Sequence, residues 1–139
     1  MKKAYGYTRE IQNSKTLVPI STQKGLIRKH CIENNIKLVR MFSDKADPNM
    51  DHYPKGLKRL RGSLRNNHAD YVIVSGFENV FINQFNYYSI KHDFEYLKSE
   101  IVSVSKPIWD AKPYEEFMAD IIKRMDEFNS KLLGRNKHI

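Results

Sequence analysis

The stretch that decides the fold is KAYGYTREIQ, residues Lys3–Gln12. The run from Ala4 to Tyr7 does not alternate polar and apolar residues, which is typical of a strand buried on both faces in the centre of a parallel sheet. A charged turn at Arg9–Glu10 follows directly. Because open parallel sheets bind ligands where the carboxyl ends of strands run into loops, we expect a functional site at this turn.

Downstream of this strand, predicted helices and strands alternate. Hydrophobic periodicity, caps and turn residues predict helices over residues 21–34, 54–66, 83–99 and 114–132, and further strands over residues 36–42, 70–75 and 101–104. Alternation of this kind predicts an α/β fold with three layers, in which helices cover both faces of a mostly parallel sheet of about four or five strands. The segment 76–83 is expected to be a loop.

The predicted helices each have an apolar face. Leu57, Leu60 and Leu64 form a stripe on the second helix. The first helix, expected to be capped by Ser21 or Thr22, carries Leu26, Ile27, His30 and Cys31 on one face, and the third carries Phe85, Tyr88, His92 and Tyr96. We therefore expect Cys31 to be a core residue and not a nucleophile.

The longest periodic segment lies at the end of the chain. Apolar residues follow the helical repeat over several turns, from Tyr114 to Leu132. We divide the chain into an α/β domain, residues 1–112, and a long amphipathic helix with a basic tail, residues 113–139. A helix this apolar either covers the sheet or packs against a second chain, and we favour dimerisation.

The composition favours a polyanionic partner. The 139 residues include 24 Lys and Arg against 16 Asp and Glu, a formal net charge of +8. Nucleic acid is the commonest partner of such a chain. The basic residues expected to contact DNA phosphates, with little sequence specificity, are Lys58, Arg61 and Arg65 of the second helix and Arg135 and Lys137 of the tail. The alternative is a solvated basic face without a partner.

Other classes of protein have little support. With a single cysteine the chain forms no internal disulfide, so we expect a cytoplasmic location, and no apolar run approaches the length of a membrane helix. The aspartate-rich segment 43–52 lacks the glycine and terminal glutamate of a calcium loop, so no metal is expected. There is no Gly-rich phosphate loop, so no cofactor is expected either.

Several segments, in this order, resemble the N-terminal catalytic domain of the serine recombinases, the resolvase/invertase family. They are GYTR at 6–9, the helix start at Ser21–Gln23, FSDKA at 42–46, YPKGLKRL at 53–60 and DYVIVS at 70–75. The resemblance covers nearly the whole chain and implies a resolvase-like fold. Family members attack a DNA phosphodiester with a serine hydroxyl, and arginines stabilise the developing negative charge. The resemblance also implies a final helix that mediates dimer contacts. Members usually continue into a helix-turn-helix domain, whereas this chain ends at Ile139, which predicts low sequence specificity.

Against the family pattern, the catalytic positions are degenerate. Where the family has Tyr-x-Arg-Val-Ser, this chain has Ile11 at the position of the nucleophile. The family run Arg-Leu-Asp-Arg-Leu-x-Arg-Ser is replaced by GFENVFIN at 76–83, in which only Glu78 keeps the acidic position, and Tyr53 stands where an arginine is expected. The surviving family positions are Arg9, Gln23 and Asp44. Since loss of a nucleophile alone costs orders of magnitude in rate, we expect no intact catalytic site.

Three functions fit this pattern. The first is a resolvase-like protein that has lost cleavage and acts as a DNA-associated or recombinase-associated accessory factor, as a homodimer or with another recombinase. The second is a divergent active recombinase with Ser14 or Thr8 as the nucleophile. The third is a protein-interaction module in which the apolar residues of segment 76–83 form a docking surface. The same residues would instead be core if they pack inward.

Overall fold

The computed structural model describes residues 1–11, 18–45, 51–106 and 114–134. Contacts divide the chain into two compact units, Met1–Trp109 and Asp110–Ile139, and each is described by itself.

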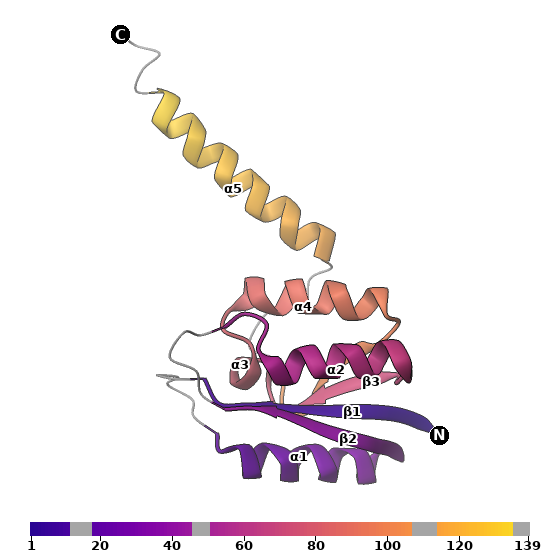
Figure 1. Cartoon of the computed structure of the whole chain (residues 1–139). Helices are drawn as coiled ribbons and strands as arrows, with labels where there is room; N and C mark the ends of the chain where they lie inside the picture. The colour runs from indigo at the N-terminus through magenta and orange to yellow at the C-terminus, as the bar shows by residue number, and fades with distance from the viewer. Residues whose placement is uncertain (12–17, 46–50, 107–113, 135–139) are drawn as a thin grey trace. The chain divides into compact units, whose positions relative to one another are not determined.

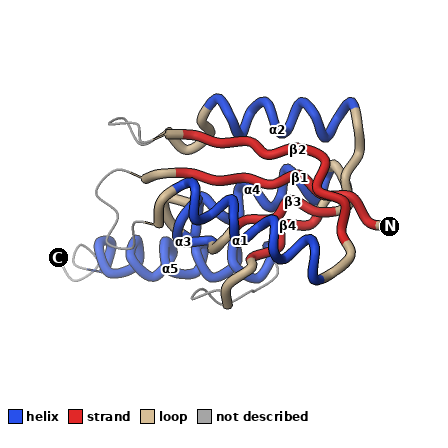
Figure 2. The backbone as a smooth tube through the Cα atoms, turned by 90° about the horizontal axis from the view of Figure 1, so that it is seen from below, coloured by secondary structure: helices blue, strands red, loops and turns tan. Residues whose placement is uncertain are grey.

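The first unit is built on a parallel sheet (Figures 1 and 2). Its strands are β1 (Lys2–Arg9), β2 (Ile36–Asp44), β3 (Tyr71–Val74) and β4 (Glu100–Ser103), in the order β2-β1-β3-β4. All three strand pairs between described residues are parallel. The prediction of an α/β fold on a parallel sheet is confirmed, and the sheet has four strands.

Helices cover both faces of this sheet. They are α1 (Ile20–Glu33), α2 (Lys55–Asn66), α3 (Phe77–Val80) and α4 (Gln84–Tyr96). Figure 1 shows α1 against one face, and α2 and α4 over the other. This confirms the three predicted layers.

The central position of β1 explains its sequence. Ala4 lies in a buried cluster with Ile27 of α1 and Ile73 of β3, whereas the ring of Tyr5 packs edge-on against Phe42, with 5.7 Å between centroids. A Cβ on Gly6 would collide with the sulfur of Met41, so that flexible side chain would have to move to admit a larger residue. Strand β1 is thus buried on both faces, as its lack of alternation predicts.

The start and the buried face of α1 differ from the prediction. Pro19 occupies the N-cap position, and no side chain caps the helix. The buried residues are Gln23, Ile27 and Cys31, while Leu26 is 41% exposed. The expected Ser21 or Thr22 cap was wrong because proline, with its fixed φ and missing N–H, suits a helix start without a polar side chain. Burial raises the pKa of the Cys31 thiol, in agreement with its predicted core position.

The apolar face predicted for α4 was right at Tyr88 but wrong at Phe85 and Tyr96. Its buried apolar residues are Tyr87, Tyr88, Ile90 and Phe94, whereas Phe85 is 52% and Tyr96 is 87% exposed. With aromatic residues all around the helix, periodicity alone does not fix the buried side. By contrast, the predicted stripe of α2 is confirmed, since Leu57, Leu60 and Leu64 are all buried.

Segment 76–83, predicted as a loop, contains the helical turn α3. Gly76 occupies the N-cap position, and the Phe81 N–H donates to the Phe77 carbonyl at 2.9 Å. Asn83 then caps α4 by accepting from the Asn86 N–H at 2.8 Å. A four-residue turn is too short to leave a periodic signal in the sequence.

The second unit contains α5 (Tyr114–Gly134), the long terminal helix that its periodicity predicts. Ile122, Met125 and Phe128 are exposed in the described chain. Among the described residues, no helix is long and apolar enough to cross a membrane. Dimerisation through this helix stays a prediction, as does a domain boundary at residue 112.

Candidate functional site at the carboxyl ends of β1 and β3

The strand order defines where a site is expected. From neighbouring strands β1 and β3 the chain continues in opposite directions, to β2 and to β4. Such a switch point leaves a crevice at the carboxyl ends of the two strands, where open α/β sheets bind ligands. Here the end of β1 provides Arg9 and Ile11, and the segment after β3 provides α3.

Arg9 is buried, and its guanidinium donates hydrogen bonds to main-chain carbonyls. Its side chain is 3% exposed, and its Nη2 donates to the Asp51 carbonyl at 2.6 Å, while its Nη1 donates to the Val80 carbonyl at 3.4 Å. The guanidinium therefore ties the end of β1 to the segment before α2 and to the end of α3. In this arrangement two of its five N–H donors serve main-chain carbonyls.

Gln23 holds the main chain of the same residue. Its Oε1 accepts from the Arg9 N–H at 3.1 Å, and its Nε2 donates to the Arg9 carbonyl at 2.8 Å and to the Val18 carbonyl at 2.8 Å. The amide is buried in α1 and fully used. It anchors the first helix to the end of the central strand.

Asp44 connects β2, β1 and α2. Its Oδ1 accepts from the Gly56 N–H at 2.7 Å, and its Oδ2 accepts from the Leu57 N–H at 3.0 Å and from the Tyr7 hydroxyl at 2.7 Å. Pro54, at the N-cap position of α2, has no side-chain cap, and Asp44 satisfies free N–H groups of the first turn in its place. Burial and the adjacent Asp44 carboxylate hold the pKa of Tyr7 above its usual range.

Within the described residues, neither position considered for the nucleophile places a hydroxyl group at the surface of the site. Ile11, which the sequence analysis predicts at the position of the family's serine, is 8% exposed. Thr8 is fully buried, and its Oγ1 lies 2.7 Å from Ser43 Oγ in a hydrogen bond. Ser14 falls outside the described residues.

The segment that replaces the arginine run packs inward. Phe77, Val80 and Phe81 are all at most 5% exposed. Phe77 and Phe81 contact the ring of Tyr87, with centroids 4.3 and 5.3 Å apart, and burial raises the pKa of Tyr87 to about 12. The alternative of an apolar docking surface formed by these residues was wrong, because they belong to the core. Ile82 is only half-buried.

The basic residues of α2 are not equivalent. Lys58 and Arg65 are exposed, but the Arg61 guanidinium lies 4.6 Å from the centroid of the Tyr53 ring, and its Nη1 is 3.9 Å from Asp93 Oδ2. Burial raises the pKa of Tyr53 to about 12. Arg61 therefore links α2 to α4 and is less available to a partner than its neighbours. Arg135 and Lys137 fall outside the described residues.

Sequence reasoning missed the groups that accept hydrogen bonds from the Arg9 side chain. Main-chain carbonyls of Asp51 and Val80 leave no signal in a sequence. Asn86 accepts from the Ile82 N–H at 3.1 Å and donates to the His52 carbonyl at 2.9 Å. The sequence does contain a signal for this residue, because Asn83 and Asn86 form an Asn-x-x-Asn pattern that is typical of a helix start. In the described parts of the chain, no group of three or more His, Cys, Asp or Glu side chains forms a metal site.

The sequence of this chain matches the model of a known protein family. The sequence model described as "Resolvase, N terminal domain" matches residues 4–138. The chain belongs to the resolvase family. Its identification as a serine-recombinase catalytic domain from the ordered segments is therefore confirmed.

Solved structures of serine recombinases share the resolvase fold of this chain. The N-terminal catalytic domain of TP901-1 integrase is 19% identical, with 94% of this chain and 98% of that chain covered and a TM-score of 0.66. A resolvase family site-specific recombinase from Streptococcus pneumoniae is 15% identical over 99% of this chain and 93% of that one, with a TM-score of 0.63. The C-terminal catalytic domain of ISC1926 TnpA, an IS607-like serine recombinase, is 19% identical over 94% and 84%, with a TM-score of 0.61. No curated protein matches the sequence.

Proposed function

We propose that this resolvase-family chain no longer cleaves DNA and acts as a DNA-associated or recombinase-associated accessory protein. The observation that carries the proposal is the burial of Ile11 at the position of the nucleophile. An aliphatic side chain forms no phosphoester bond, and a core position offers no access to a phosphodiester.

The electrostatics of the site support the same proposal. Phosphoryl chemistry requires cations aimed at the developing negative charge. Here two of the Arg9 donors are used by the Asp51 and Val80 carbonyls, and the three arginine positions of the family run are taken by Gly76, Asn79 and Ile82, none of which is a cation. These contacts support a structural role for Arg9 and leave few cations to stabilise a negatively charged transition state.

The alternative of an unorthodox nucleophile gains nothing from Thr8. Its hydroxyl is fully buried and hydrogen-bonded to Ser43, so attack on DNA would require β1 to open. For Ser14, substitution by alanine is the decisive experiment, since any strand cleavage that depended on this hydroxyl would disappear in Ser14→Ala.

The DNA contact is assigned to the exposed basic side of α2 and to the tail. Lys58 and Arg65 are exposed together with Lys55 and Arg59, and the helix contains no acidic residue. Like charges on one helix repel each other unless an anion lies opposite. Arg61 is expected to contribute less, because Asp93 already neutralises it. Arg135 and Lys137 are the proposed contacts in the tail.

A salt titration tests this assignment. We expect the purified chain to bind random duplex DNA with an affinity that falls as salt rises, since each phosphate contact releases counterions. The Lys58→Ala/Arg65→Ala variant should lower the salt slope by about 2. Arg28→Ala/Lys29→Ala, which removes the same charge from α1, is the matched control and should leave the slope unchanged. Equal losses in both variants, or no binding by the native chain, would contradict the assignment.

A further inference from the structure

The two edges of the parallel sheet differ in how they are protected. Strand β2 forms one edge, and its register with β1 shifts between Ala4 and Tyr5, so that Val39 is an extra residue in the ladder. The exposed cations Lys37 and Arg40 lie on either side of this bulge. Bulges and charged side chains keep an edge from pairing with another strand, so the β2 edge is unsuited to a partner.

The opposite edge, formed by β4, has no such protection. The N–H groups of Glu100 and Val104 donate to main-chain carbonyls on the side of β3. Because bonding alternates along a parallel ladder, Ile101 and Ser103 direct their N–H and carbonyl groups away from β3. No strand of the described chain pairs with this edge, and the residues between Glu100 and Lys106 are uncharged. The β4 edge is therefore open to another strand.

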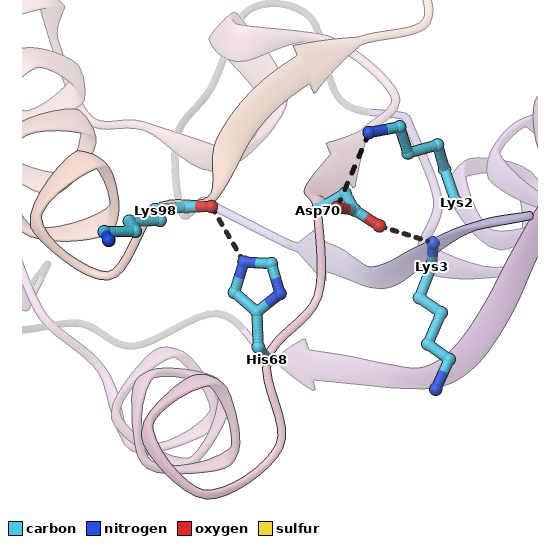
Figure 3. Close-up of polar contacts among 5 residues, drawn as sticks. All are labelled: Lys2, Lys3, His68, Asp70 and Lys98. Carbon is cyan, nitrogen blue, oxygen red and sulfur yellow. Dashed lines mark hydrogen bonds and ion pairs between the residues drawn. The ribbon is translucent and has the colours of Figure 1, made fainter.

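Hydrogen bonds fix the start of this edge strand. Lys98 has a left-handed conformation, φ 58°, after the end of α4, and the Ser99 N–H donates to the Phe94 carbonyl at 2.9 Å. His68 Nε2 donates to the Lys98 carbonyl at 2.9 Å (Figure 3). Because the strand is ordered before a partner arrives, pairing along it costs little conformational entropy.

The sequence of this edge is complementary to itself. Residues 100–106 read EIVSVSK, with an acid first, a base last and Ser103 in the centre. When two such segments pair antiparallel about Ser103, Glu100 of each copy lies opposite Lys106 of the other, and Val102 lies opposite Val104. Opposite charges and β-branched pairs across antiparallel strands both stabilise the pairing. The two central serines form a hydrogen-bonded pair, as their outward N–H and carbonyl groups require.

The side chains on one face of β4 have an incomplete cover. Val102 and Val104 are only half-buried, although both pack against the core cluster that contains Ile27 and Ile73. In the antiparallel register, the valines of two copies form one continuous apolar strip. Pairing thus removes further apolar surface from water, in addition to forming main-chain hydrogen bonds.

We propose that β4 pairs with β4 of a second copy of this chain, antiparallel about Ser103, and joins the two sheets across a two-fold axis. Stable interfaces bury roughly 1,200–2,000 Å². A strand of four residues buries far less, so the contact is weak. It forms at about millimolar concentration, or between copies that are already held close together. The inference is independent of the proposed function, because it uses neither the degenerate catalytic site nor the DNA-contacting helix.

The test uses the full, ¹⁵N-labelled chain with Met125→Asp/Phe128→Asp, which removes the association expected through α5. We expect amide shifts that change on dilution from about 1 mM to about 0.05 mM. These shifts should be centred on residues 100–106 and largest at Ile101 and Ser103, whose N–H groups gain partners. Spectra that do not change with concentration, or changes centred elsewhere, would overturn the proposal.

An exchange of charges tests the register. Glu100→Lys and Lys106→Glu each place like charges opposite one another, so each should weaken the association about fivefold or more. The double variant Glu100→Lys/Lys106→Glu restores opposite charges and should regain the native affinity. Within one extended strand the two positions are roughly 20 Å apart, so recovery reports a contact between copies.

A control separates this contact from a general effect of charge. Glu33→Lys, at an exposed position of α1, changes the net charge as Glu100→Lys does and should leave the association unchanged. A double variant that associates as weakly as the single variants would overturn the antiparallel pairing about Ser103. Equal weakening by Glu33→Lys and Glu100→Lys would do the same, because repulsion between whole chains would then explain both results.

Discussion

The three residues that the sequence analysis predicts at matching family positions, Arg9, Gln23 and Asp44, each hold main chain in place. Gln23 pairs with both the N–H and the carbonyl of Arg9, Arg9 reaches the carbonyls of Asp51 and Val80, and Asp44 receives the first N–H groups of α2. Ile11, which the sequence analysis predicts at the nucleophile position, is instead part of the core. Under the proposed function, this division explains how catalytic positions can disappear while the fold persists.

Substitution of Arg9 distinguishes a structural role from a residual phosphate-binding role. Arg9→Met keeps much of the side-chain volume but leaves two carbonyls without their donor, so we expect the free energy of unfolding to fall by roughly 1–3 kcal/mol. Arg28→Met, at an exposed position of α1, is the matched control and should change stability little. Urea denaturation measures both. An Arg9→Met chain as stable as the native one would mean that the guanidinium is held for a ligand.

At the scale of elements, two glycines of α2 occupy opposite environments. A Cβ on Gly56 would lie 2.5 Å from the Ser43 carbonyl oxygen and 2.7 Å from Asp44 Oδ2, whereas a Cβ on Gly62 would meet nothing within 4 Å. The first glycine allows the start of the helix to approach β2. At Gly62, no neighbouring atom of the described structure requires a glycine.

We therefore expect opposite effects of the same substitution in one helix. Gly56→Ala should destabilise the chain by about 1–3 kcal/mol, because the cap provided by Asp44 must move. Gly62→Ala should stabilise it by about 0.5–1 kcal/mol, because alanine loses less backbone entropy in a helix. Thermal unfolding monitored by circular dichroism measures both changes. Equal shifts of the two variants would contradict the crowding at Gly56.

The elements also show how far the sequence predicts structure. Strand β1 and helix α2 were predictable because each has a single pattern, unbroken apolar residues in one and an i, i+3, i+7 leucine stripe in the other. The buried face of α4 was not, because aromatic residues surround the helix and tertiary packing selects among them. Similarly, Phe77 and Phe81 pack inward against Tyr87, a contact that no local pattern encodes.

For the whole molecule, the order and spacing of weak motifs were enough to identify the family. Contacts between distant segments could not be predicted from the sequence. The sequence predicts a site at Arg9 and places Ile11 where the family has its nucleophile. It did not indicate that Asp51 and Val80, 42 and 71 residues away, accept the Arg9 donors. Long-range hydrogen bonds to main chain depend on the fold and not on the identity of the residue that accepts.

The terminal helix provides a prediction about assembly. The exposed apolar residues Ile122, Met125 and Phe128 follow one another every three residues along one side of α5, so we expect the chain to form a dimer through this helix. Met125→Asp/Phe128→Asp should yield monomers in sedimentation equilibrium, while Asp126→Asn/Glu127→Gln, a control on the same turn, should remain dimeric. A native chain that is monomeric at micromolar concentration would contradict this prediction.

The central claim is that this chain has kept the recombinase fold without its cleavage chemistry. The most direct test is incubation of the native chain and of Ile11→Ser with supercoiled DNA of random sequence, followed by a denaturing assay for covalent protein–DNA adducts. We predict no adduct and no nicked DNA from either protein, since restoring one hydroxyl restores neither access nor the missing arginines. A phosphoserine or phosphothreonine adduct formed by the native chain would contradict the account.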